Sequence, residues 1–165
     1  MIPFLFALSL QPILLPPENG SVEFKAIGHP SALKVLGKGK GLVMHLVKAG
    51  DQVSGTATFD LDSLDTGISL RNRHMREKYL ETKLFPQAKF ILTPLTIALQ
   101  DIPFTGKLWL HGVEKSISGL AQIEKKEAEY SFTAHFSLKI SDFKIDIPSF
   151  MGITVADEVD VTVTN

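Results

Sequence analysis

The chain has 165 residues, close to the usual length of one domain, and 44% of them are apolar. Its 17 Lys and Arg residues against 18 Asp and Glu residues give a formal charge of -1. That balance lacks the cationic excess that nonspecific nucleic-acid binding needs. The chain has no cysteine, which excludes disulfides, thiolate zinc sites and a cysteine nucleophile. These features predict a single soluble domain that does not bind nucleic acid.

An apolar segment, residues 1–19, precedes the first regular pattern. Four prolines interrupt it, and it is too short for the roughly 20 residues of a membrane-spanning helix. No Lys or Arg precedes Lys25, and the best small-residue cleavage site, Ala7-Leu8-Ser9, is weak. Two interpretations therefore stay open: an export signal, or an arm that packs on the domain formed by residues 20–165.

From residue 20 onward, apolar and polar residues mostly alternate, as is typical of strands with one face on a core. The expected strands lie near residues 22–26, 42–47, 52–61, 90–97, 104–110, 117–123, 130–140 and 159–163. Pro94 indicates an edge or a bulge, and the glycine-lysine run from Gly37 to Gly41 indicates a flexible turn. About eight strands at this spacing predict an antiparallel sandwich or barrel.

One segment departs from the two-residue period. Leu70 to Leu84 is rich in helix formers and predicts a short helix, about residues 70–84, that Pro86 stops. This helix is basic, because Arg71, Arg73, Arg76 and Lys78 are opposed only by Glu77. These charges either form a solvated face that pairs with nearby acidic residues, or meet an anionic head group at a barrel mouth.

The acidic turn at residues 60–67 resembles a calcium loop only loosely. Leu64 and Asp65 stand where an EF-hand needs a ligand and a glycine. The better interpretation is that Asp62, Ser63 and Asp65 cap the turn and the following helix.

Residues for catalysis or metal binding are not apparent. The five histidines show no metal-ligand spacing, and His111 and His135 are expected on an exposed outer face because they alternate with polar residues. The chain also lacks a G-x-S-x-G motif and a phosphate-binding glycine loop. We therefore expect no enzyme activity, no metal and no cofactor.

Phenylalanine is unusually abundant, with eleven residues against two Tyr and one Trp. Such side chains either fill the interior of an eight-stranded barrel or line a cavity in it, because an interior of that size suits both. The sequence leaves this choice open.

Several motifs in consistent order carry a resemblance to a known family. Residues 59–80 read FDLDSLDTGISLRNRHMREKYL, and FPQAKF follows at residues 85–90. GKLWLHGVEK at residues 106–115, SDF at 141–143 and DEV at 157–159 extend the match, which covers about residues 20–165. The chain resembles the YceI-like polyisoprenoid-binding proteins.

This resemblance implies a lipocalin-like antiparallel barrel that holds a long isoprenoid, such as a polyprenyl chain or a quinone, and it implies export to the bacterial periplasm. The chain departs from the family pattern at residues 26–34, where many relatives have an arginine-histidine pair. We expect the ligand contacts there to differ.

We therefore predict a noncatalytic lipid-binding barrel with at most peripheral membrane contact. The predicted wall residues are Phe24, Phe59, Leu108, Leu110, Phe132, Phe136 and Leu138, and the predicted head-group contacts are Arg71, Arg73 and Arg76. The alternative is a packed barrel without an internal ligand that docks a protein partner, with Trp109 as an anchor. Nothing in the sequence indicates an oligomeric state.

Overall fold

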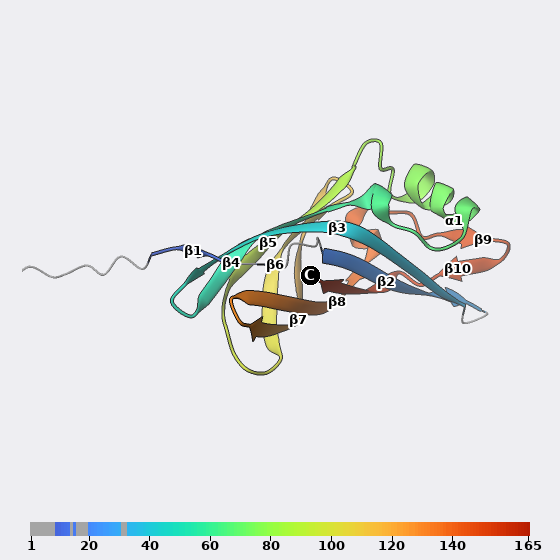
Figure 1. The fold of residues 1–165 in the computed structure, drawn as a ribbon. Helices are drawn as coiled ribbons and strands as arrows, with labels where there is room; N and C mark the ends of the chain where they lie inside the picture. Colours follow the sequence, from blue (N-terminus) through green and yellow to red (C-terminus); the bar gives the residue numbers. More distant parts are fainter. Residues whose placement is uncertain (1–8, 14, 16–19, 31–32) are drawn as a thin grey trace, which may run out of the picture.

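In the computed structural model, eight long antiparallel strands close into a barrel (Figure 1). The structure describes residues 9–13, 15, 20–30 and 33–165. The barrel strands are β2 (Gly20–His29), β3 (Lys34–Ala49), β4 (Gln52–Asp60), β5 (Gln87–Thr96), β6 (Ile102–Leu110), β7 (Val113–Lys126), β8 (Glu129–Lys139) and β11 (Glu158–Thr164). They pair in this order, and β11 pairs with β2 to complete the ring. The predicted fold class is confirmed.

Smaller elements cover one end of the barrel. The helical elements are η1 (Leu61–Ser63), α1 (Ser69–His74), η2 (Met75–Tyr79) and η3 (Ile140–Phe143). A hairpin of β9 (Ser149–Phe150) and β10 (Ile153–Val155) pairs with the end of β2. Figure 1 shows α1, β9 and β10 together at the end of the barrel opposite to β1.

The inward residues form two core clusters, one toward each end. The cluster beneath the helix includes Phe59, Leu108 and Phe143, and the second includes Val53 and Phe104. Phe143 and Val53 are each only 1% exposed, so both clusters have fully buried centres. The period-two pattern produces this arrangement, because every second residue of a closed barrel points inward.

The described part of the N-terminal segment lies on the barrel. β1 (Gln11–Pro12) pairs with β3, the backbone N–H of Ile13 donates to the carbonyl of Leu46 at 3.0 Å, and the Ile13 side chain is buried in the second cluster. The prediction that residues 1–19 are either an export signal or a packed arm also concerns residues 1–8, 14 and 16–19, which lie outside the described residues. Within the described part of the chain, no helix has the length and apolar character that crossing a bilayer requires.

The helix is shorter than the predicted 70–84. α1 and η2 together end at Tyr79, and the Leu80 N–H bonds to the Met75 carbonyl across a wider π turn. Glu81 then adopts a left-handed conformation with φ of 47°, which a helix does not continue through. The next residues form a turn in which the Leu84 and Phe85 amides both donate to the Glu81 carbonyl.

The prediction that Gly37 to Gly41 forms a flexible turn is wrong, because this run lies inside β3. Gly37 and Gly39 are buried, and side chains there would overlap the rings of Phe24 and Phe59. Gly37 and Gly39 are thus needed for space rather than for turning, whereas Gly41 has a φ of 87° that favours glycine. The predicted bulge at Pro94 is confirmed by a register shift between β4 and β5 opposite it.

Candidate functional site

The barrel encloses a cavity of about 520 Å³ that extends from its middle to the end covered by α1. All eight barrel strands except β7 contribute lining side chains, and segments 64–80 and 145–155 complete the wall. Four large apolar lining residues are exposed: Leu33, Ile68, Leu70 and Phe150. The cavity therefore opens to solvent between these residues, and this half of the barrel is hollow. Its volume is within the range of small-molecule sites.

Six of the seven predicted wall residues line this cavity: Phe24, Phe59, Leu108, Leu110, Phe136 and Leu138. Phe132 does not, because it lies farther along β8, where it stacks on Tyr130 and packs against the second cluster. The alternation of apolar and polar residues along β8 assigns Phe132 to the inner face of the barrel. It does not indicate how far along the barrel axis the cavity extends. A role in ligand contact stays a prediction for all seven.

Sequence reasoning missed much of the lining near the opening. Ile145, Pro148, Phe150, Ile153 and Val155 come from a segment in which no strand was expected. The available signal was the high apolar content of residues 145–155. Such side chains are buried only if the segment folds over the end of the barrel.

The polar lining side chains all lie at the helix end. They are Thr66, Arg71, His74, Tyr79 and Ser149, among 36 lining residues. The Ser149 amide lies 3.4 Å from the Tyr79 hydroxyl, and the His74 and Phe150 rings meet edge to face at 6.1 Å. The cavity is thus apolar in its depth and polar on one side of its opening.

The acidic turn positions this polar group. Asp65 Oδ1 accepts hydrogen bonds from the Gly67 amide and from Asn72 Nδ2, both at 2.7 Å. The hydrogen bond from the Gly67 amide, and after it the bond from Asn72, hold the pKa of the Asp65 carboxyl below its usual value. Asn72 Oδ1 in turn accepts from the Thr66 hydroxyl at 2.7 Å. Asp65 thus caps the turn as expected, but the predicted cap of the helix is wrong, because Ile68 at the N-cap of α1 makes no side-chain capping bond. The Asp62 amide is itself capped by Asp60, and the Ser63 hydroxyl donates to the Asp60 carbonyl.

The three predicted head-group arginines lie in different surroundings. Arg71 lines the cavity, and its guanidinium donates to the Thr66 hydroxyl at 2.9 Å and to the Thr66 carbonyl at 3.0 Å. Arg73 is exposed and lies outside the lining. Arg76 points toward the barrel, where its Nη2 donates to the Leu64 carbonyl at 3.0 Å and its Nε is 4.0 Å from Asp62. Only the first of the three is placed at the cavity.

His111 is not on an exposed outer face, as expected, but has a side chain only 9% exposed. It lies in the turn between β6 and β7 with φ of 52°, so strand alternation no longer determines where its ring points. Its Nε2 is 2.7 Å from Glu81 Oε2, and its Nδ1 is 3.0 Å from the Phe143 carbonyl. His135 is exposed, as expected.

The sequence profile of the YceI-like domain matches residues 15–164. The chain belongs to the YceI-like domain family. Among the family's curated relatives, a UPF0312 protein of Enterobacter sp. strain 638 and Protein YceI of Escherichia coli are each 31% identical over 104 residues. Each alignment covers 59% of this chain and 53% of the relative, so the match spans about half the length of these relatives.

Solved structures support the YceI-like fold. BcnA of Burkholderia cenocepacia superimposes with a TM-score of 0.72 at 22% identity, covering 87% of this chain and 94% of BcnA. A polyisoprenoid-binding domain from Saccharophagus degradans, implicated in plant cell wall breakdown, gives a TM-score of 0.68 at 16% identity, covering 95% and 96%. The YceI protein of Campylobacter jejuni gives 0.60 at 20%, covering 83% and 88%. At these identities the likeness concerns the fold.

Proposed function

We propose that this protein is a noncatalytic carrier of one long apolar lipid of the isoprenoid class, held with its tail in the barrel. The observation that carries the proposal is the 520 Å³ cavity with its largely apolar lining. An apolar tail gains about 0.8 kcal/mol for each methylene that leaves water, so a long chain binds such a cavity without specific contacts. The polyisoprenoid-binding neighbour from S. degradans and family membership support the ligand class.

The lipid's polar end lies at the opening in this proposal. Thr66, Arg71, His74, Tyr79 and Ser149 are the lining side chains with hydrogen-bonding groups, and all are at the helix end. A buried head group without partners would be costly, so the tail enters first and the head stays near these residues. The alternative of a filled barrel lacks support, because the cavity leaves this half of the interior unfilled. Export to the periplasm, which the family resemblance implies, completes the proposal.

Titration with a long polyprenyl alcohol and the matching pyrophosphate tests both parts. We expect saturable binding of both ligands, and we expect Arg71→Ala to weaken the pyrophosphate about tenfold more than the alcohol, because a charge-assisted contact to phosphate contributes about 1.5–3 kcal/mol. Arg73→Ala is the matched control, since Arg73 lies outside the lining. Absence of saturable binding would refute the carrier. Equal losses for both ligands in Arg71→Ala would refute the orientation alone.

A further inference from the structure

The cavity opening is surrounded by exposed apolar side chains from three separate segments. We call Leu33, Ile68, Leu70, Phe150 and Met151 the mouth rim; their exposed fractions run from 43% to 86%. Thr154 of β10 pairs with His29 of β2, which brings the hairpin beside the β2–β3 connection. The contact between His74 and Phe150 brings the helix beside the hairpin. The rim is therefore one surface rather than scattered residues.

Apolar surface runs without interruption from the mouth rim into the cavity. Leu33, Ile68, Leu70 and Phe150 belong to both the rim and the cavity lining. A single exposed leucine is ordinary on a soluble protein, but five large apolar side chains around an opening form a patch typical of an interaction site. Met151 stands out most, because it is 86% exposed at the tip of the hairpin.

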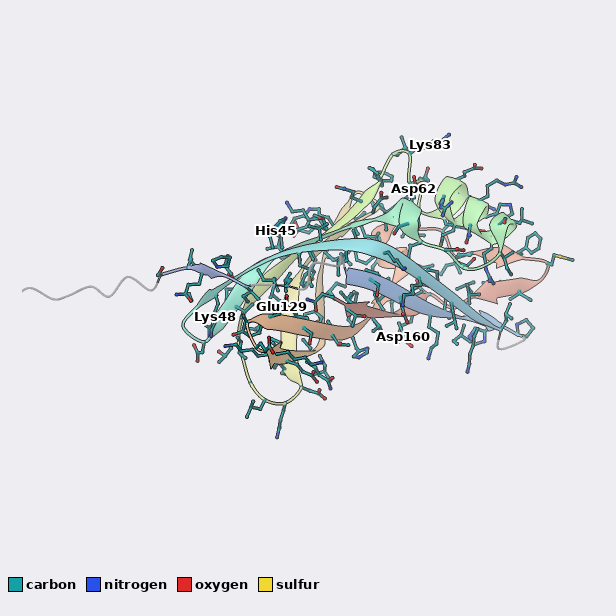
Figure 2. All side chains as sticks on the ribbon, in the orientation of Figure 1. His45, Lys48, Asp62, Lys83, Glu129 and Asp160 are labelled. Atoms are coloured by element: carbon teal, nitrogen blue, oxygen red, sulfur yellow. The ribbon has the colours of Figure 1, made fainter. Side chains whose placement is uncertain are left out.

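Basic residues accompany this rim. The segments that form it, residues 33–36, 68–80 and 144–155, contain six Lys or Arg against two Asp or Glu, whereas the whole chain has 17 against 18. Lys34, Arg73, Lys78 and Lys144 are exposed there, and Glu77 and Asp146 are the exposed acidic residues. Asp62 and Asp65, just before these segments, are also exposed, but Asp62 lies 4.0 Å from Arg76 and Asp65 is hydrogen-bonded to Asn72. Lys48 and Glu129 mark the opposite end (Figure 2).

We propose that the mouth rim docks on the surface of an anionic lipid bilayer, with Met151 and its neighbours inserted among the head groups and the basic residues against lipid phosphates. Apolar side chains flanked by Lys and Arg are the composition that interfacial membrane binding uses. The inference rests on the proposed function, because docking by this end would let a tail pass between bilayer and cavity without crossing water. A site that docks a protein partner would not need apolar surface that continues from the rim into the cavity, so the bilayer explains this feature better.

Vesicle co-flotation of the full chain tests this docking. We expect the protein to float with vesicles of an equal mixture of phosphatidylglycerol and phosphatidylcholine, weakly with phosphatidylcholine alone, and less as salt rises. Met151→Asp should lower partitioning about tenfold, because it replaces an inserted apolar group with a repelled charge. Asp tolerates the left-handed conformation of Met151. Leu99→Asp, at a fully exposed leucine in the β5–β6 connection, is the matched control and should not lower it.

Equal effects of the two variants, no flotation of the wild type, or equal binding to both vesicle types would each overturn the docking proposal. So would a Met151-dependent dimer in sedimentation without vesicle binding, which would assign the rim to a second copy. Met151 does not line the cavity, so polyprenyl alcohol binding should survive in Met151→Asp. Intact alcohol binding without flotation refutes the docking alone, whereas flotation without alcohol binding refutes the carrier function.

Discussion

His111 connects three segments that are distant in sequence. It lies between β6 and β7, and its ring nitrogens contact the Glu81 carboxylate after the helix and the Phe143 carbonyl in η3. A carbonyl only accepts, so Nδ1 donates to Phe143. The Phe85 ring packs against the imidazole at 4.6 Å. This residue therefore holds the helix and η3 in place at the end of the barrel that carries the cavity.

We expect His111→Ala to lower the free energy of unfolding by about 2–3 kcal/mol, because it leaves a carbonyl and a carboxylate without their partner. Urea denaturation measures the change. His135→Ala is the control, since His135 is exposed and its Nδ1 lies 3.0 Å from the Thr162 hydroxyl, and it should cost less than about 0.5 kcal/mol. Similar costs for the two variants would contradict the role assigned to His111.

At the scale of elements, β3 differs most from its sequence-based prediction. The alternation of Lys38 and Lys40 with three glycines looks like a loop, because glycine is rare inside strands. The reason for Gly37 and Gly39 lies on the two strands that flank β3: the rings of Phe24 in β2 and Phe59 in β4 occupy the space that side chains at these glycines would take. A pattern within one segment does not contain that information.

Gly37→Ala should destabilise the protein by about 1–3 kcal/mol through overpacking against Phe24. Chemical denaturation of a double-mutant cycle with Phe24→Leu provides the check, because the smaller side chain relieves the overlap. We expect the cost of Gly37→Ala to fall by at least half in the Phe24→Leu background. An unchanged cost would mean that backbone conformation, and not the ring, requires glycine here.

The elements as a set were largely predictable from the sequence. Strands such as Ile102–Leu110 bury every second residue, so their period is visible directly. The helix end was not predictable to the residue, because the left-handed Glu81 contacts His111, which is distant in sequence and lies in the turn between β6 and β7. The hairpin of β9 and β10 was missed because each strand has only two or three residues, too few to show a period.

At the scale of the whole molecule, the barrel has two unlike ends. Ile13, Leu46, Val53 and Ile102 fill one end, whereas the other leads through the mouth rim to the cavity. The sequence predicted which residues face the barrel interior. It did not predict the position along the strands at which the packed interior ends and the cavity begins. Phe132 and Phe136 illustrate this limit, since they share a face of β8 and only Phe136 lines the cavity.

The most direct test of the carrier proposal is native mass spectrometry of protein purified from its own host. We predict a copurified lipid that dissociates only on denaturation, with a mass that fits a polyprenyl chain or a quinone. Ala134→Phe should abolish this adduct because Ala134 lines the cavity, whereas His135→Phe, on the adjacent exposed position of β8, should keep it. A wild-type protein with a clean apo mass, or an adduct that survives in Ala134→Phe as in His135→Phe, would contradict a lipid inside the barrel.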